Sequence, residues 1–324
     1  MTPLLQSLKY DILLVQPPIR DFYLTTKRTI PYGLASIAAN LKAAGFSVQI
    51  LDALATRQSR TLSLPIEMAY LQAYYNRPDR SPFALFHHYK HFGYSYETIG
   101  QRVKTAQPSL VGISSLFTAY AAEAIQTAEV IKAHHPECKI VMGGHHPTVL
   151  PEQVMASSAV DFVIRGEGEV SMPLLARALL KGTRYEDIPG LIYRKSDGSL
   201  HVGQTAIMDH LEDYPLPATD LLNWRYYSRN KKASMMVVAS RGCPWSCTYC
   251  SMGASSPFRY RRRSVASVIT EIEKAADGAE IGFIDFEDEN LSLDRTWFLR
   301  LLDEITQSFA GKQLELRAMN GLLP

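Results

Sequence analysis

Short apolar runs alternate with longer amphipathic stretches through the first half of the chain. The apolar runs predict strands, which cover residues 11–18, 47–53, 109–116, 138–144 and 160–169. The intervening stretches predict helices, which cover residues 31–44, 119–134, 151–157 and 171–180. Such an alternation predicts right-handed βαβ units. We therefore expect an α/β fold whose doubly wound parallel sheet is covered on both faces.

Ligands of such sheets bind beyond the carboxyl ends of the strands. The residues at these positions are 16–18, Asp52, 114–116, 143–144 and 166–168. A dinucleotide-binding domain needs G-x-G-x-x-G after the first strand, but residues 16–18 read Gln-Pro-Pro. The ligand of this edge is therefore expected to be of another class.

Residues 58–96 interrupt the alternation and are rich in aromatic side chains. They predict an inserted helical segment, which either covers a sheet edge or the ligand mouth, or packs its aromatic rings into the core. His87, His88 and His91 lie in this insertion without nearby Cys or carboxylate partners, so they make a poor metal site.

Residues 183–234 change character and predict a connector between domains. Asp197-Gly198 predicts the turn of a β-hairpin, and Pro215 and Pro217 suit an irregular linker. A second α/β run follows, with strands at residues 235–240, 281–286 and 314–320 and helices at 265–276 and 295–309. The predicted domains are therefore residues 1–182 and 235–324, joined by 183–234.

Composition narrows the class of protein. The 324 residues hold 34 Lys and Arg against 32 Asp and Glu, which argues against a polyelectrolyte that binds nucleic acid in bulk. Arg259, Arg261, Arg262 and Arg263 form one basic run, which suits a loop paired with local acids better than a nucleic-acid site. The apolar runs are too short to span a bilayer, and the first residues do not resemble a signal peptide.

Three of the four cysteines lie in one loop of the second α/β run. Cys243, Cys247 and Cys250 have the spacing C-x3-C-x2-C, directly after a predicted strand. Thiolates are soft ligands that suit zinc or iron–sulfur clusters. A structural zinc would need a fourth ligand nearby, and redox thiols more often have the spacing C-x-x-C. A metal held by thiolates indicates a reducing compartment, so we expect a cytoplasmic protein.

This loop resembles the signature of radical SAM enzymes, in which an aromatic residue, here Tyr249, precedes the last cysteine. Arg241-Gly242 before the loop fits as well. The resemblance implies that Cys243, Cys247 and Cys250 hold a [4Fe–4S] cluster, which binds S-adenosylmethionine (SAM) at its open iron. It also implies one-electron cleavage of SAM to a 5′-deoxyadenosyl radical, with an electron donor such as flavodoxin or ferredoxin.

An acidic segment follows the next predicted strand. Related radical SAM proteins have an acidic pair and an Asn here, and Asp288, Glu289 and Asn290 fit that pattern. A carboxylate at this place could accept hydrogen bonds from the SAM ammonium group, and Glu287 is a further candidate. The alternative is an acidic cap at the end of the strand.

The first domain resembles Rossmann-like cobalamin-binding domains. Ser114, Ser115 and Leu116 match their S-x-L pattern, and Gly143 and Gly144 match their G-G pattern at the expected spacing. Paired glycines let the backbone approach a bulky ligand. The resemblance extends to His146 and to Gly166, Glu167 and Gly168, which makes these residues further candidates for cofactor contacts.

The sequence departs from that pattern after the second strand. Leu54 stands where the family has its cobalt-binding His, and Arg57 stands where it has Gly. Members of the cobalamin-dependent radical SAM family often lack this His. The resemblance therefore implies cobalamin bound base-off, without a His ligand.

Together the motifs identify residues 11–320 as resembling the cobalamin-dependent radical SAM family. A complete eight-unit barrel takes about 250 residues, so six units take about 190. Residues 235–324 are therefore expected to form only the first half of a radical SAM (β/α) barrel, apparently truncated at its C-terminal side.

The resemblance implies an enzyme that methylates an unactivated carbon or phosphorus centre of a small-molecule or natural-product-type substrate. Radical cyclisation, rearrangement or oxidation is the alternative with the same cofactors. An alternative of another class is a non-catalytic cobalamin-binding fragment.

Overall fold

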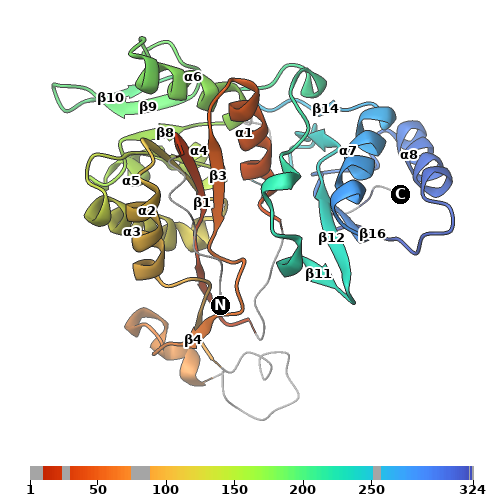
Figure 1. The fold of residues 1–324 in the computed structure, drawn as a ribbon, viewed down its shortest axis with the longest axis horizontal. Coiled ribbons are helices and arrows are strands. Elements are labelled where there is room, and N and C mark those ends of the chain that lie inside the picture. Colours follow the sequence, from red (N-terminus) through yellow and green to blue (C-terminus); the bar gives the residue numbers. More distant parts are fainter. Residues whose placement is uncertain (1–9, 24–29, 74–87, 251–256, 321, 323–324) are drawn as a thin grey trace. The chain divides into compact units, whose positions relative to one another are not determined.

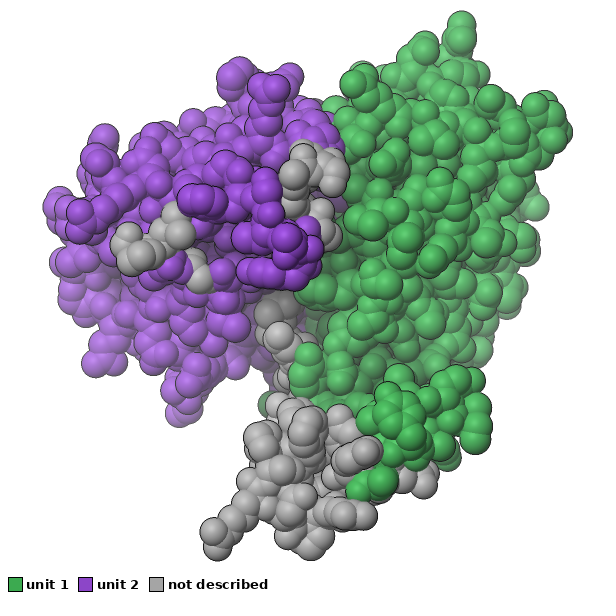
Figure 2. Space-filling model, turned by 180° about the vertical axis from the view of Figure 1, so that it is seen from behind, with its two compact units in different colours: residues 1–28, 45–206 green, residues 29–44, 207–324 purple. Residues whose placement is uncertain are grey.

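The computed structural model describes residues 10–23, 30–73, 88–250, 257–320 and 322. The chain forms two compact units, each containing segments that are distant in sequence. Unit 1 comprises residues 1–28 and 45–206, and unit 2 comprises residues 29–44 and 207–324 (Figure 2). The predicted domains, residues 1–182 and 235–324, stay a prediction.

Unit 1 is built on a seven-stranded sheet with the order β10-β9-β8-β7-β6-β1-β3. Five of its strands run parallel, as predicted: β1 (Ile12–Gln16), β3 (Val48–Asp52), β6 (Leu110–Ser114), β7 (Lys139–Gly143) and β8 (Phe162–Ile164). Gln16 pairs with Asp52 and Ser114 pairs with Gly143, so the carboxyl ends of these strands lie at one edge. The predicted ligand-binding residues therefore share that edge.

The predicted hairpin is confirmed. β9 (Leu191–Arg194) and β10 (Leu200–Val202) pair antiparallel around the turn, where Ser199 N–H donates to Asp197 Oδ1 at 2.9 Å. β9 also pairs antiparallel with β8. The hairpin thus extends the large sheet of unit 1.

Five helices of unit 1 are described: α2 (Tyr96–Ala106), α3 (Ala121–His134), α4 (His145–Val149), α5 (Pro151–Met155) and α6 (Gly168–Lys181). α2 and α3 pack side by side (Figure 1). α2 was not predicted, although Ser95 caps its first turn by accepting a hydrogen bond from Thr98 N–H. Apolar side chains of the sheet and of α2, α3 and α5 form the main core of the unit, including Val111, Ile140 and Ile131.

The prediction of a helical insertion is wrong for the part of residues 58–96 that the structure describes. β4 (Ser59–Thr61) and β5 (Lys90–Phe92) form a small antiparallel sheet with β2 (Ile19–Asp21), and only η1 (Ile66–Ala73) is helical, as a 3-10 helix. His91 is buried, and its Nε2 lies 3.0 Å from the Tyr94 carbonyl oxygen. His87 lies outside the described residues.

Unit 2 has an open sheet with the order β11-β12-β15-β16. β12 (Lys232–Val237), β15 (Ile281–Phe286) and β16 (Glu315–Ala318) are parallel, and β11 (Ser228–Arg229) pairs antiparallel with β12. α7 (Val265–Gly278) and α8 (Arg295–Ser308) pack on this sheet through Val268, Ile272 and Leu301. The described residues form no closed barrel, in agreement with the expectation of a partial one.

Helix α1 (Tyr32–Ala43) belongs to unit 2, although it connects β1 with β3 along the chain. Ala218 N–H donates to the Ala35 carbonyl oxygen at 3.0 Å, and Lys42 pairs with Asp220 at 2.6 Å. The remaining short elements of unit 2 are η4 (Leu211–Asp213), η5 (Thr219–Leu221), η6 (Trp224–Tyr226), β13 (Ser240–Arg241) and β14 (Arg261–Arg262). In the described ranges, no helix has the length and apolarity that crossing a membrane requires.

Candidate cofactor sites

The two cobalamin-binding patterns meet at the carboxyl edge of the large sheet. Ser115 N–H donates to the Gly143 carbonyl oxygen at 2.8 Å, and His146 N–H donates to the Ser115 carbonyl oxygen at 3.2 Å. The structure therefore brings the predicted residues Ser114, Ser115 and Gly143 together, and Ser115 contacts the start of α4 directly. Leu116 follows them with 44% of its surface exposed, so an apolar ligand can reach it.

Glycine is required at residue 144 because of its backbone. Its φ is +121°, and a Cβ there would lie 2.5 Å from the Ser115 carbonyl oxygen. At Gly143, by contrast, a Cβ would meet only the Ile164 carbonyl oxygen at 3.9 Å. Gly144 thus lets two loops approach each other, while Gly143 leaves space at the end of β7.

The hydroxyl of Ser115 is the polar atom that fits a ligand at this edge. Its Oγ is buried and has no hydrogen-bond partner among the described residues. A buried hydroxyl without a partner is costly, and a polar group of a bound ligand would relieve that cost. This hydroxyl and the space at Gly143 fit the tail of a cobalamin.

His146 is buried beside these residues. Its Nδ1 lies 3.3 Å from Thr118 Oγ1, and burial lowers its pKa, which favours the neutral imidazole. At the end of β3, Leu54 packs with Ile19 and Phe92, and its N–H donates to Asp52 Oδ1 at 2.8 Å. The position of the family's cobalt-binding His is therefore part of an apolar cluster here.

Thr148, which no sequence pattern indicated, joins two of the predicted loops. Its hydroxyl donates to the Gly144 carbonyl oxygen at 2.8 Å and accepts from Gly166 N–H at 2.9 Å. Gly166 has a φ of +90°, and a Cβ there would lie 2.2 Å from the Ala206 carbonyl oxygen. The same oxygen accepts a hydrogen bond from Glu167 N–H at 2.9 Å. These contacts explain Gly166 by backbone packing, and Gly168 begins α6.

The cysteine loop of unit 2 is flanked by two short paired strands. β13 pairs antiparallel with β14, and Gly242, with a φ of +79°, lies against the backbone of Arg259. Cys243 is half-buried, and Cys247 and Cys250 are exposed. None of the four cysteines, all of them in the described residues, forms a disulfide.

Three reduced thiols on one exposed loop are the donor set of a cluster with one open iron. Within the described ranges, however, no three His, Cys, Asp or Glu side chains are already arranged as a metal site. The Cys250 N–H donates to the Cys247 carbonyl oxygen at 3.1 Å, and Tyr249 is 90% exposed. The donor chemistry thus fits the cluster, and metal binding by the three cysteines stays a prediction.

The two predicted carboxylates of the acidic segment after β15 differ in burial. Asp288 is buried and accepts from Ser240 Oγ at 2.5 Å and from Ala239 N–H at 3.2 Å. Burial raises the pKa of Asp288 to about 6. Glu289 is half-buried, and Asn290 is buried with its Oδ1 unpartnered among the described residues. Glu289 is thus the more accessible of the two predicted carboxylates.

The basic run is engaged locally. Arg262 pairs with Asp294 at 2.9 Å, Arg263 pairs with buried Glu271, and Arg261 donates to the Met208 carbonyl oxygen at 2.5 Å. The prediction that these arginines pair with local acids is confirmed for Arg262 and Arg263, whereas Arg261 contacts a backbone carbonyl.

Comparison with known proteins finds a family model for part of unit 1 and longer relatives that match most of the chain. The family model of the B12 binding domain matches residues 84–176, which include the S-x-L and G-G positions. An uncharacterized methyltransferase of Pyrococcus horikoshii is 31% identical over 202 residues, covering 62% of this chain and 44% of that protein. An anaerobic magnesium-protoporphyrin IX monomethyl ester cyclase of Rubrivivax gelatinosus is 30% identical over 228 residues, covering 67% and 40%.

A longer match reaches through both units. The cytidylyl-2-hydroxyethylphosphonate methyltransferase of Streptomyces wedmorensis is 25% identical over 319 residues, covering 87% of this chain and 55% of that protein. The chain therefore spans only about half or less of the length of these relatives.

Solved structures show the same fold. The radical SAM methyltransferase TsrM from Kitasatospora setae, solved with cobalamin and a [4Fe–4S] cluster, aligns with a TM-score of 0.64 and 19% identity, covering 95% of this chain and 54% of that one. The cobalamin-dependent SAM radical enzyme OxsB aligns with a TM-score of 0.68 and 16% identity, covering 96% and 38%. The chain thus contains a match to the B12 binding domain, and its sequence relatives and its fold are similar to those of cobalamin-dependent radical SAM enzymes.

Proposed function

We propose that the chain forms the cobalamin-binding and cluster-binding part of a radical SAM methyltransferase. The observation that carries the proposal is the loop of unit 2 with three reduced thiols, Cys243, Cys247 and Cys250, in a chain that also contains a B12-binding domain. A protein that only bound cobalamin would not need this donor set.

Each unit contributes its own residues to the proposed chemistry. In unit 1, the Ser115 hydroxyl and the space at Gly143 accept the tail of base-off cobalamin, and exposed Leu116 contacts an apolar part of it. In unit 2, the three thiolates hold a [4Fe–4S] cluster, and Glu289 accepts hydrogen bonds from the SAM ammonium group. When bound, the cofactors supply radical generation and methyl transfer, while the protein positions them.

Methylation is the proposed reaction because two of the three relatives described above are methyltransferases. One of these, a phosphonate methyltransferase, matches 87% of this chain. The substrate class is a small molecule or natural product, the electron donor is a flavodoxin or ferredoxin, and the compartment is the cytoplasm. The second candidate is a radical cyclase, favoured by the match to the porphyrin-ester cyclase over 67% of the chain.

Anaerobic reconstitution tests the cofactors. We expect the chain to take up about four irons and four sulfides and to retain cobalamin through gel filtration. Cys243→Ala should lose cluster loading and SAM-derived 5′-deoxyadenosine, whereas Cys138→Ala, which changes a buried thiol of unit 1, should keep both. Equal loading of the two variants would contradict the proposal.

Deuterated-methyl SAM separates the two candidate reactions once a substrate is in hand. A methyltransferase passes the label to its product, and mass spectrometry detects the added mass. A cyclase forms a product without label but still releases 5′-deoxyadenosine.

A further inference from the structure

The peptide between β12 and β13 leads directly into the cysteine loop. It consists of Val238 and Ala239, followed by Ser240 of β13. Asp288 holds it from one side, because Oδ2 accepts from Ala239 N–H at 3.2 Å and Oδ1 accepts from Ser240 Oγ at 2.5 Å. Both carboxylate oxygens of Asp288 thus accept hydrogen bonds from this peptide.

Arg263 holds the same peptide by donating hydrogen bonds to its carbonyl oxygens. Its backbone N–H donates to the Ala239 carbonyl oxygen at 2.9 Å, and its Nη1 donates to the Val238 carbonyl oxygen at 3.4 Å. Arg263 directly follows β14, the strand by which the loop returns. The same residue therefore fixes both the outgoing and the returning ends of the loop.

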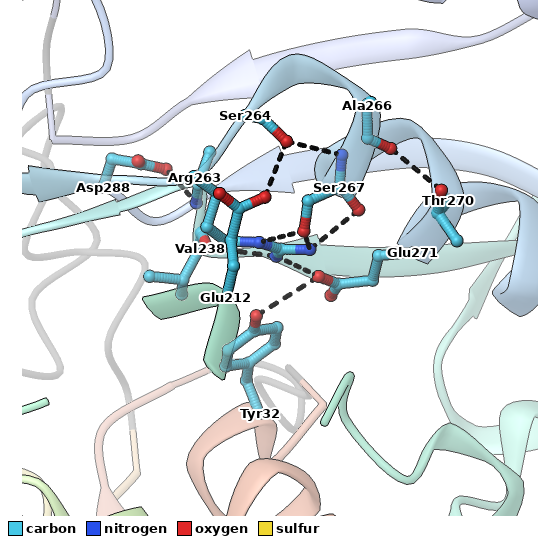
Figure 3. A network of polar contacts seen from close by, with 11 residues as sticks. Tyr32, Glu212, Val238, Arg263, Ser264, Ala266, Ser267, Thr270, Glu271 and Asp288 are labelled. Carbon is cyan, nitrogen blue, oxygen red and sulfur yellow. Dashed lines mark hydrogen bonds and ion pairs between the residues drawn. The ribbon is translucent and has the colours of Figure 1, made fainter. Parts of the chain in front are cut away.

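Arg263 is itself fixed by a buried network (Figure 3). Its Nη2 donates to the Ser267 carbonyl oxygen at 2.8 Å, and its Nη1 pairs with the Glu271 carboxylate. The side chains of Arg263 and Glu271 are only 6% and 2% exposed. The Tyr32 hydroxyl of α1 lies 3.5 Å from Glu271 Oε2.

Such a network is a poor way to gain stability. Removing an Arg and a Glu from water has a large desolvation cost, and apolar residues of similar volume often stabilise a protein as well or better. What a buried ion pair with directional hydrogen bonds does provide is one defined geometry. Here that geometry belongs to the base of the cysteine loop, from which residues 242–250 extend.

We propose that Asp288 and Arg263 are positioning residues, which set the geometry of the cysteine loop and thereby of the cluster it binds. This inference rests on the proposed function. It separates the roles of the two neighbouring carboxylates, since Asp288 holds the protein backbone and Glu289 is left to face SAM. Asp288 acts through Ala239 and Ser240 and touches no cofactor.

Three variants test the proposal in the reconstituted chain. Asp288→Ala and Arg263→Lys remove contacts to the loop base, and Ser240→Ala removes the same hydrogen bond from the other partner. Arg262→Ala is the matched control, because Arg262 neighbours Arg263 but pairs with Asp294 at a half-exposed site. Iron loss to a chelator and the EPR spectrum of the reduced cluster, with and without SAM, are the readouts.

We expect the first two variants to lose iron about tenfold faster than the unchanged chain, as residues behind metal ligands typically do. Their EPR signals should broaden even without SAM, because the loop samples several geometries. Ser240→Ala should shift the signal in the same direction by less, and Arg262→Ala should change neither readout. Asp288→Asn, which retains an oxygen acceptor for Ser240, should partly restore the signal.

The outcomes of these experiments distinguish a failure of the proposed function from a failure of the positioning role. If the unchanged chain binds no cluster, the proposed function fails. If it binds a cluster and Asp288→Ala retains iron and spectrum, the positioning role is overturned. If Asp288→Ala changes the spectrum only when SAM is present, Asp288 is a SAM ligand, which also overturns it. If Asp288→Ala fails to fold by circular dichroism, Ser240→Ala decides, and an unchanged EPR signal there overturns the proposal.

Discussion

Ser115 and Gly143 are joined by a backbone hydrogen bond of 2.8 Å at the ends of two neighbouring parallel strands. This bond places the buried Ser115 hydroxyl, which has no hydrogen-bond partner in the part of the chain that the structure describes, beside Gly143, which has no side chain. The next residue, Gly144, turns the chain toward α4 with a φ of +121°. The cobalamin-binding edge therefore depends on backbone geometry as much as on side chains.

Gly144→Ala should destabilise unit 1 and weaken cobalamin retention. The substitution combines an unfavourable φ with a Cβ 2.5 Å from the Ser115 carbonyl oxygen, so the expected loss is about 2–4 kcal/mol. Urea unfolding of the chain without cofactors measures it.

Gly182→Ala is the matched control for that variant. Gly182 also has a positive φ, +68°, but a Cβ there would have no heavy atom within 4 Å. Its expected loss is about 1 kcal/mol, with cobalamin retention unchanged. Equal losses in the two variants would mean that the close approach at Ser115 is unimportant.

The four cysteines should differ in their reaction with iodoacetamide. Burial raises the pKa of Cys138 to about 12, and its side chain is inaccessible, so almost no thiolate is present at neutral pH. Without denaturant and without a cluster, mass spectrometry should find three modified residues, Cys243, Cys247 and Cys250. Modification of Cys138 should require denaturant, and a bound cluster should protect the other three.

Stability should depend on pH through Asp288. Its pKa is about 6 in the folded chain and near 4 when unfolded, so the folded chain retains this proton between those values. The stabilisation is complete below about pH 4 and is lost as the pH rises through 6. Over this range the free energy of unfolding should fall by about 2–3 kcal/mol relative to Asp288→Asn, in the chain without cofactors. Parallel pH profiles of the two proteins would contradict the shift.

Arg317→Met should destabilise unit 2 by leaving a buried charge. Arg317 Nη2 lies 2.5 Å from Asp285 Oδ2, and the Asp285 side chain is only 9% exposed. Since Arg317 itself is partly exposed, the expected loss is about 2 kcal/mol, below that of a fully buried pair. The control is Arg184→Met, whose partner Glu186 is exposed and whose loss should be too small to detect. Urea unfolding compares the two.

The sequence predicted the parts of the fold that depend on local pattern. Strand β15 occupies the predicted residues 281–286, and the Asp197-Gly198 turn forms its hairpin. Cofactor motifs were recognisable because each follows a strand, where the parallel sheet brings them to one edge. Continuous apolar runs and turn residues carry this information without tertiary context.

Contacts between distant segments could not be predicted in this way. Asp288 and Ser240 are 48 residues apart, and neither the spacing nor the composition indicates that the carboxylate turns toward the loop base. Thr148 joins two glycine loops through one hydroxyl, and Thr in a short helix gives no local signal of that role. Within residues 58–96, aromatic content suggested helix, whereas residues 90–92 form a strand that pairs with β2 on one side and with residues 59–61 on the other.

Helix α1 has a consequence for how such proteins can be recombined. The polypeptide passes between the two units three times, since residues 29–44 belong to unit 2 while their neighbours on both sides belong to unit 1. A module that a single crossover can transplant must be continuous in the gene, and neither unit meets that condition. A chimaera that replaces residues 1–206 with those of a relative also replaces helix α1. The new helix must then fit Ala218 and Glu271 of the retained unit 2, or both units must be replaced together.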